Sequence, residues 1–422
     1  MNKRCVDIAV IGAGPAGLAA ALEAERLGAG KVLLLERDTD LGGILQQCIH
    51  DGFGIHRFGK RLSGNQYAQH FIDALGNSSV EVLCDTMVLE LGSNRKIIAC
   101  NSREGIIEIE ARAVILAMGC RERTASQVLI YGDRPAGVLT AGVVQRYINM
   151  EGYLPGTNAV ILGSGDIGLI MARRMTLEGM KVKGVYEVMS SPGGLTRNIV
   201  QCLDDFGIPL HLSHTVTRVK GRKRVESVVI ARVDGERKPI PGTEEEIPCD
   251  LLVLAVGLIP ENELSLRTGI GIDVNTKGPV LDSAFMTSVP GIFAAGNVAA
   301  VFDLVDYVSQ SAEIAARGAV AFIRGELSAT GWDPVTAGEN VSFVVPQRLR
   351  REAVSGKRVF YMRAKQPEKV ATLVCTSGES AAGEEKVIFK KRCRHVAPPE
   401  MISFEAEVSG PFMVAMKKEA EK

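Results

Sequence analysis

The segment GAGPAG, residues 12–17, decides the fold that this sequence predicts. It follows the apolar run VDIAVIG at residues 6–12, and the alanine-rich stretch LAAALEAERLGAG comes directly after it. Another apolar run at residues 31–35 then ends in Glu36. Short apolar runs of this kind are typical of buried parallel strands, and the stretch between them has the length and periodicity of a helix. The order is therefore strand, glycine turn, helix, strand and acid.

The same order returns in the middle of the chain. Residues 159–162 form an apolar run, GSGDIG follows at residues 163–168, and LIMARRMTLEGM then leads to KVKGVY, which ends in Glu187. The first glycine precedes the acid by 24 positions in both copies. A single glycine motif is weak evidence, but two copies in a complete strand–helix–strand context are strong evidence for two dinucleotide-binding units.

Each residue type in the turn has a physical reason. The first glycine permits the tight turn, the second lets backbone amides approach a pyrophosphate, and the third lets the helix pack close to the strand. The helix N-terminus adds unpaired N–H groups and partial positive charge for the phosphates. Glu36 and Glu187 can accept hydrogen bonds from ribose hydroxyls, and the Glu187 carboxylate would repel a 2′-phosphate, which favours NAD(H) over NADP(H). The alternative is that either glutamate is a solvated strand end.

Three further apolar runs end in a glycine turn. AVILAMG at residues 113–119 follows the first copy, and LLVLAVG at residues 251–257 follows the second. We expect both runs to return the chain to its sheet near the bound nucleotide, so the repetition comprises two whole domains. GIFAAGN at residues 291–297 precedes another helical stretch.

With these motifs in this order, the chain resembles the two-dinucleotide-domain flavoproteins related to the pyridine nucleotide-disulfide oxidoreductases. GAGPAG with Glu36 resembles their FAD site, and GSGDIG with Glu187 resembles their NAD site. The AAGN segment that ends at Asn297 resembles the motif that contacts the flavin ribityl chain. That family usually has an aspartate at the position of Asn297. An asparagine can still bond a ribityl hydroxyl, but it adds no negative charge beside the flavin.

The resemblance implies FAD and NAD(H) as cofactors. The residues expected to bind them are Gly12, Gly14, Pro15, Ala16, Gly17, Glu36, Arg37, Gly43, Gly119, Gly163, Gly165, Asp166, Ile167, Gly168, Glu187, Gly257, Gly296 and Asn297. The expected fold class is α/β, with two Rossmann-like domains and a small β-rich C-terminal domain. The FAD domain would comprise residues 1–119 and 279–325, with the NAD domain inserted at residues 120–278 and the C-terminal domain at residues 326–422.

The C-terminal domain has no motif that indicates its function. Short strands are expected at residues 341–345, 358–362, 370–375, 386–390 and 403–407. A packing lid and a docking surface for partner subunits are equally compatible with this pattern.

Three longer segments resemble one subgroup of these flavoproteins. They are LGGILQQCIHDGFG at residues 41–54, GCRERT at residues 119–124 and GNVAAVFDLVDYVSQ at residues 296–310. The subgroup is associated with an FAD-dependent glycerol-3-phosphate dehydrogenase, and relatives are subunits of amino-acid, opine and cyanide-forming dehydrogenases. The resemblance implies an electron-transfer role beside a partner dehydrogenase subunit, in a homo- or hetero-oligomer.

Cys48 is the only cysteine in the segment where the disulfide reductases carry a redox dithiol. The missing second cysteine argues against an internal dithiol relay. Cys48 could act alone as a thiolate, with His50 or His56 moving a proton, so Cys48 and His50 are the catalytic candidates. The alternative is that Cys48 is a small buried residue that packs beside the flavin.

Composition narrows the class of protein. Lys plus Arg equals Asp plus Glu at 49 each, so the net charge does not indicate a nucleic-acid partner. The nine cysteines are scattered without CxxC spacing, which predicts no metal site and indicates a reducing, cytoplasmic compartment. No run reaches the roughly 18 apolar residues of a transmembrane helix. Glycines interrupt the N-terminal apolar run, which otherwise imitates a signal peptide.

The motifs together predict an FAD-dependent oxidoreductase that exchanges hydride with NAD(H) and passes electrons to or from a partner dehydrogenase or a small acceptor. Two alternatives stay open. One is a stand-alone NADH oxidase or quinone-type reductase, and the other is an FAD-binding dehydrogenase subunit that does not turn over.

Overall fold

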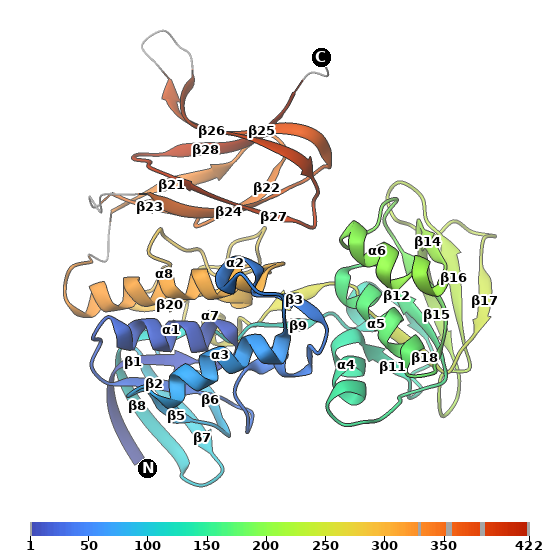
Figure 1. Cartoon of the computed structure of the whole chain (residues 1–422), viewed down its shortest axis with the longest axis horizontal. Coiled ribbons are helices and arrows are strands. Elements are labelled where there is room, and N and C mark those ends of the chain that lie inside the picture. The colour runs from blue at the N-terminus through green and yellow to red at the C-terminus, as the bar shows by residue number, and fades with distance from the viewer. Residues whose placement is uncertain (1, 328–330, 352–356, 380–384, 420–422) are drawn as a thin grey trace. The chain divides into compact units, whose positions relative to one another are not determined.

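The computed structural model describes residues 2–327, 331–351, 357–379 and 385–419 (Figure 1). The chain divides into two compact units. Unit 1 comprises Met1–Gln46, Asp51–Cys120 and Pro260–Lys422, and unit 2 comprises Gln47–His50 and Arg121–Ile259. Among the residues described, we find no helix with the length and apolar character that a membrane crossing requires.

A seven-stranded sheet forms the base of unit 1. The order is β5-β2-β1-β8-β7-β6, and β20 also pairs with β8. β1 is parallel to both of its neighbours, β2 and β8, whereas β6, β7 and β8 pair antiparallel. The bounds are β1 Asn2–Ile11, β2 Val32–Leu35, β5 Glu81–Leu83, β6 Thr86–Leu91, β7 Lys96–Asn101, β8 Gly105–Leu116 and β20 Ile292–Ala294.

Three helices lie on one side of this sheet, where α1 packs between α3 and α8 (Figure 1). The buried face of α1 consists mainly of alanines, so neighbouring helices and strands can approach it closely. The bounds are α1 Pro15–Arg26, α3 Gly64–Gly76 and α8 Val305–Ile323. Short elements of the same unit are α2 Ile55–Phe58, α7 Glu263–Arg267, β3 Asp51–Phe53 and β4 Leu62–Ser63.

Unit 2 repeats this architecture with a five-stranded parallel sheet in the order β11-β18-β12-β13-β14. The central strands are almost entirely buried, as expected for parallel strands covered on both faces. The bounds are β11 Val138–Thr140, β12 Asn158–Leu162, β13 Lys181–Glu187, β14 Leu210–Leu212, β18 Leu251–Leu254, α4 Ala141–Asn149, α5 Asp166–Leu177 and α6 Thr196–Cys202.

A second sheet of unit 2 has the order β10-β15-β16-β17. Its strands are β10 Tyr131–Gly132, β15 His214–Lys220, β16 Ser227–Arg232 and β17 Glu245–Pro248. A small two-stranded sheet pairs β9 (Cys120–Glu122) with β19 (Leu258–Pro260), where the chain enters and leaves this unit.

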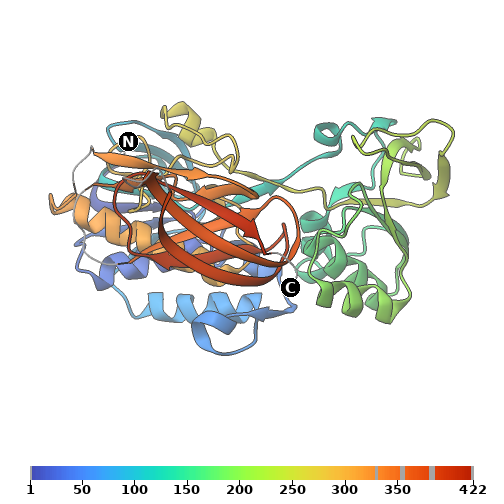
Figure 2. The same ribbon diagram turned by 90° about the horizontal axis from the view of Figure 1, so that it is seen from above.

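The C-terminal part of unit 1 is a β structure with its own core (Figure 2). Five strands run in the order β23-β21-β28-β25-β26, and three run in the order β22-β24-β27. The bounds are β21 Trp332–Ala337, β22 Val341–Val345, β23 Arg348–Arg350, β24 Arg358–Ala364, β25 Glu368–Glu379, β26 Glu385–Val396, β27 Met401–Ala406 and β28 Phe412–Lys418. Both views place these strands on the α8 side of unit 1 (Figures 1 and 2).

These observations confirm the expected fold class, with two Rossmann-like sheets and a β-rich C-terminal part. The five predicted C-terminal strands correspond to β22, β24, β25, β26 and β27. β21, β23 and β28 were not predicted. β21 contains Pro334, which weakens a strand pattern, and β28 owes part of its apolar character to methionines rather than to β-branched residues.

The second boundary between the units lies after Ile259, earlier than the expected position at residue 278. The intervening residues contact unit 1. The Thr268 hydroxyl donates to the Leu91 carbonyl at 2.7 Å, and a Cβ on Gly278 would overlap the Ala299 carbonyl oxygen. The division into three domains at residues 1–119 with 279–325, 120–278 and 326–422 stays a prediction.

Candidate functional site

The glycine turn of unit 1 connects β1 to α1. Gly12 has a φ of +100°, its N–H donates to the Leu35 carbonyl at 2.8 Å, and a Cβ there would lie 2.6 Å from the Ala117 carbonyl oxygen. A Cβ on Gly17 would overlap the Gly12 carbonyl oxygen, so α1 can approach β1 only with glycine at this position. These contacts explain the first and third glycines as requirements of the turn itself.

Gly14 differs from Gly12 and Gly17 because it has open space beside it. In the described residues, no heavy atom lies within 4 Å of the position that its Cβ would take. Gly14 is the N-cap of α1, and no side chain of the described chain caps that helix. The N–H groups of Ala16 and Gly17 stand in the first turn after Pro15, which has none. This helix end therefore has both the room and the donors for a phosphate group.

Glu36 ends β2 beside the turn and is only 6% exposed. One carboxylate oxygen accepts the Ala13 N–H at 2.6 Å, and the other accepts the Asp38 N–H at 2.9 Å. The glutamate is therefore held by the backbone on both sides, which contradicts the alternative of a solvated strand end. Its remaining lone pairs are available to ribose hydroxyls. Arg37, the next residue, is exposed.

Unit 2 has the same turn between β12 and α5. Gly163 has a φ of +104°, its N–H donates to the Tyr186 carbonyl at 2.7 Å, and a Cβ there would overlap the Ala255 carbonyl oxygen. A Cβ on Gly168 would overlap the carbonyl oxygen of Gly163, whereas Gly165 has no described heavy atom within 4 Å of its Cβ position. Ile167, between these glycines, is partly exposed.

Glu187 is 7% exposed and repeats the bonding of Glu36. One carboxylate oxygen accepts the Ser164 N–H at 2.9 Å and the Ser164 hydroxyl at 2.7 Å. The other accepts the Met189 N–H at 2.9 Å. In both units the acid thus binds the second residue of the turn and the amide two positions after itself, so the two sites are structurally equivalent.

The structure extends the repeat to a second glycine pair that sequence reasoning missed in unit 2. Gly42 and Gly43 follow Glu36 by six and seven positions, and Gly193 and Gly194 follow Glu187 at the same spacing. The Gly42 N–H donates to the Ala13 carbonyl, and the Gly193 N–H donates to the Ser164 hydroxyl, both at 2.9 Å. Only Gly43 was predicted as a site residue, although the equal spacing is visible in the sequence.

The glycines that end β8 and β18 also occupy equivalent places. Gly119 and Gly257 have φ values of +73° and +104°. The residues two positions before them, Ala117 and Ala255, are those that border the first glycines of the turns. The expected proximity of these strand ends to each turn is therefore present in both units.

The third predicted segment lies beside α1 in unit 1. A Cβ on Gly296 would be 2.8 Å from the Ala16 Cβ, and the Gly296 N–H donates to the Ser311 hydroxyl at 3.0 Å. The Asn297 side-chain oxygen accepts the Phe302 N–H at 3.0 Å, and its amide nitrogen lies 3.5 Å from the Cys120 sulfur. Asn297 thus orders its own loop and keeps a second amide hydrogen for another acceptor.

Asp306 in the first turn of α8 supplies a buried carboxylate near this segment. Its Oδ2 accepts the His56 N–H at 3.1 Å, while its Oδ1 is buried and accepts no hydrogen bond from any residue that the structure describes. The N-terminal position favours this charge because the helix dipole is positive there. Sequence reasoning missed Asp306, since only its burial distinguishes it from a surface acid.

Cys48 and His50, the predicted catalytic candidates, belong to unit 2 by their contacts. The segment lies on α4, where Gln47 donates to the Gln145 side chain at 2.9 Å and the Cys48 sulfur lies 3.9 Å from the same side-chain oxygen. Burial raises the pKa of the Cys48 thiol to about 12. A thiol with that pKa is protonated at neutral pH, so the geometry favours packing over nucleophilic chemistry. His50 is partly exposed.

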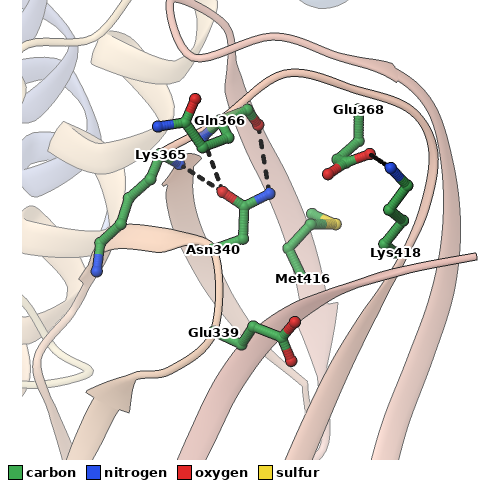
Figure 3. Close-up of a pocket in the computed structure, with 7 residues that line it drawn as sticks. All are labelled: Glu339, Asn340, Lys365, Gln366, Glu368, Met416 and Lys418. Atoms are coloured by element: carbon green, nitrogen blue, oxygen red, sulfur yellow. Dashed lines mark hydrogen bonds and ion pairs between the residues drawn. The ribbon is translucent and has the colours of Figure 1, made fainter. Parts of the chain in front are cut away.

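Two cavities of the described residues are lined by side chains outside the glycine turns. One, of about 330 Å³, is in the C-terminal part (Figure 3). Asn340 bonds there to the backbone of Lys365 and Gln366, and Lys418 pairs with Glu368 at 3.8 Å. Another, of about 400 Å³, lies among α1, α2, α3 and α8.

Comparison with known proteins places this geometry in a family. The sequence model of the pyridine nucleotide-disulphide oxidoreductases matches residues 6–319. Among solved structures, the thioredoxin reductase of T. acidophilum has a TM-score of 0.62 at 24% identity, covering 75% of this chain and 98% of that one. At this identity the likeness establishes the fold alone.

Three curated relatives are named as components of larger enzymes. The A component of opine oxidase from Agrobacterium tumefaciens (strain Ach5) is 27% identical over 74% of this chain and 64% of its own length. The HcnB component of hydrogen cyanide synthase from Pseudomonas protegens is 24% identical over 69% and 66%. The alpha chain of sarcosine oxidase from Corynebacterium sp. (strain P-1) is 27% identical over 92% and 40%. The chain thus spans less than two thirds of each of these relatives.

Proposed function

The chain belongs to the pyridine nucleotide-disulphide oxidoreductase family, and we propose that it exchanges hydride between NAD(H) and bound FAD and passes electrons to or from a partner dehydrogenase subunit. Members of this family bind FAD and NAD(P)H, which agrees with the cofactors that the sequence predicts. The observation that carries the proposal is the pair of equivalent turns, each with a buried glutamate and open space beside its middle glycine.

Unit 1 has the residues that fit FAD. The space beside Gly14 and the N–H groups of the first turn of α1 would receive the pyrophosphate, and Glu36 would accept the ribose hydroxyls. Asn297 would bond the ribityl chain through its second amide hydrogen. The flavin supplies the hydride chemistry when bound, so the protein needs to position it and exclude solvent rather than provide an acid or base.

Unit 2 has the residues that fit NAD(H). Gly165 and the first turn of α5 would receive its pyrophosphate, and Glu187 would bind its adenosine ribose. We propose that NAD(H) is preferred over NADP(H), because a buried carboxylate at this position repels a 2′-phosphate. The full set of predicted contacts in both units belongs to this proposal.

Electrons that reach the flavin need an acceptor other than an internal disulfide. None of the nine cysteines, all of which lie in the described ranges, forms a disulfide bond, and Cys48 has no second cysteine in its segment. The burial of Cys48 further disfavours a thiolate relay. We therefore propose that a partner protein accepts the electrons, and a small-molecule acceptor is the alternative.

The names of the relatives support a partner protein, since opine oxidase, hydrogen cyanide synthase and sarcosine oxidase are all named as assemblies with subunits. The resemblance of three segments to the glycerol-3-phosphate dehydrogenase subgroup makes that dehydrogenase the first partner to test. We also propose a cytoplasmic location, because scattered cysteines without disulfides suit a reducing compartment.

Anaerobic stopped-flow absorbance tests the proposal. FAD-loaded protein is mixed with NADH or NADPH, and fast bleaching of the oxidised-flavin band by NADH alone is the expected result. Candidate partner dehydrogenases are then added to the reduced protein. Rapid turnover with oxygen or a quinone alone would favour a stand-alone reductase, and absence of bleaching by both nucleotides would favour a subunit that does not turn over.

A further inference from the structure

We infer that Asp166 is a positioning residue that, with Asn198, holds the second glycine pair of unit 2 against the NAD(H) site. The inference rests on the proposed function and names a part of that site. It concerns residues 193–198, which form the end of the connection between β13 and α6 and the first turn of α6.

Three hydrogen bonds fix this segment. Asp166 is the first residue of α5, and its Oδ1 accepts the Leu195 N–H at 2.9 Å and the Asn198 side-chain amide at 2.6 Å. The Gly193 N–H donates to the Ser164 hydroxyl at 2.9 Å. Both anchors, Ser164 and Asp166, belong to the glycine turn itself.

The segment fits closely beside the turn because it carries glycines. A Cβ on Gly194 would lie 2.9 Å from both the Asp166 Oδ1 and the Ser164 carbonyl oxygen. A Cβ on Gly193 would lie 3.6 Å from the Gly165 N. The segment therefore borders the open space at Gly165, where the pyrophosphate would approach. Gly43 makes the equivalent approach in unit 1, since its Cβ would be 3.0 Å from the Gly14 Cα.

The charge of Asp166 needs an explanation, because a carboxylate in the first turn competes with phosphate for the helix N-terminus and repels it. Pro15 occupies the equivalent position in unit 1 and is uncharged. The bonds from Leu195 and Asn198 engage one oxygen of Asp166 and direct it toward α6. The Asp166 carboxylate, which would repel the phosphates of NAD(H), thus orders the segment that borders their site.

The test measures NAD⁺ affinity of the FAD-loaded protein by isothermal titration calorimetry for Asp166→Ala, Asp166→Asn and a control, Asp205→Ala. Asp205 is an exposed acid of the same unit, so the control removes equal charge. Asp166→Ala should weaken NAD⁺ binding about 10-fold, the size expected for one charge-assisted bond. Asp166→Asn keeps the acceptor oxygen and removes the opposing charge, so it should bind NAD⁺ at least as tightly as the wild type, and the control should stay within about 2-fold of the wild type.

A second pair of variants keeps the test decisive if Asp166→Ala does not fold. Asn198→Asp places two carboxylates at the position of a 2.6 Å bond and should weaken NAD⁺ binding, whereas Asp166→Asn with Asn198→Asp restores a donor–acceptor pair and should recover it. The rate of amide hydrogen exchange of residues 190–198 should rise in the single variants Asp166→Ala and Asn198→Asp, and not in the double variant.

The outcomes separate the two proposals. If the wild type binds neither NAD⁺ nor NADH, the proposed function is wrong and the inference falls with it. If the wild type binds NAD⁺ but Asp166→Ala or Asn198→Asp binds it equally well, the positioning role is overturned and the proposed function stands. A KM for NADH that rises at unchanged kcat would support the role, because the segment would order the nucleotide site without contacting the transferred hydride.

Discussion

Gly163 and Gly165 lie two positions apart in one turn, yet their surroundings assign them different roles. Gly163 has a φ of +104° and no room for a Cβ, whereas Gly165 has a φ of −63° and open space beside it in the described residues. The first is required by the backbone. The backbone conformation of the second is one that alanine also adopts. A substitution of Gly165 by alanine should therefore weaken ligand binding without lowering the free energy of unfolding.

A matched pair of alanine variants tests this distinction. Gly165→Ala should leave the free energy of unfolding within about 0.5 kcal/mol of the wild type but weaken NAD⁺ binding at least about 10-fold. Gly163→Ala should lower the free energy of unfolding by about 1–3 kcal/mol. Chemical denaturation and calorimetric titration check both. Unaltered NAD⁺ affinity in Gly165→Ala would place the pyrophosphate elsewhere.

Glu187 should control which nicotinamide nucleotide is used. Glu187→Gln removes the negative charge that opposes a 2′-phosphate, so the ratio of kcat/KM for NADH to that for NADPH should fall about 10-fold. The equivalent change in unit 1, Glu36→Gln, is the control and should leave this ratio unchanged while weakening FAD retention. A ratio that does not move in Glu187→Gln would assign the selectivity to other residues.

At the scale of elements, the segment Gln47–His50 shows how a local motif can belong to a distant part of the chain. It follows the glycine pair of unit 1 in sequence, but it packs on α4 of unit 2, where the Asn149 side chain donates to the Gln47 carbonyl at 2.9 Å. Burial there raises the pKa of the Cys48 thiol from its ordinary 9.0 to about 12.

This burial predicts the behaviour of Cys48 across pH. Alkylation by iodoacetamide should be slow up to pH 9, and Cys48→Ser should reduce its flavin with NADH within about 2-fold of the wild-type rate. Because the folded pKa is raised, the stabilising contribution of the protonated thiol is complete below pH 9 and declines as pH rises toward 12. Exposed Cys5 is the alkylation control. Fast labelling of Cys48 at pH 7 would revive the thiolate hypothesis.

The elements that the sequence predicts best are those in which a short stretch of adjacent residues permits only one backbone conformation. The glycine turns, the acids after β2 and β13 and the strands that end in Gly119 and Gly257 could all be predicted, because sterics at a few adjacent residues select them. The assignment of Gln47–His50, the burial of Asp306 and the strands β21, β23 and β28 could not. The first two depend on contacts with residues far away in the sequence. The three strands depend on pairing with other strands, because their own sequence patterns are weak.

At the scale of the whole molecule, the C-terminal strands have a core of their own, but some of their residues also belong to the core of the seven-stranded sheet of unit 1. Tyr361 on β24 is fully buried, its ring centroid lies 5.1 Å from that of Phe302 and 5.6 Å from that of Tyr307, and its hydroxyl donates to Gln310 at 2.8 Å. Phe302 also bonds to Asn297 through its backbone. This contact favours the packing role over a docking surface alone.

Two substitutions of Tyr361 test that role. Tyr361→Ala should lower the free energy of unfolding by about 3–5 kcal/mol and speed the loss of FAD, since it opens a cavity beside the Asn297 loop. Tyr361→Phe removes only the hydroxyl and should cost about 1 kcal/mol. Thermal release of flavin fluorescence measures both effects. If Tyr361→Ala retained FAD as firmly as the wild type, the C-terminal part would not support the flavin site.

The equivalence of Glu36 and Glu187 has a consequence for competition in the cell. The turns and their acids fit the part that FAD and NAD have in common, adenosine diphosphate, and nothing in the paired bonds distinguishes one parent molecule from the other. Protein stripped of flavin should therefore take up two molecules of free ADP per chain. Free ADP would then compete with the flavin for the turn of unit 1, so flavin loading would depend on the concentration of free ADP as well as on that of FAD.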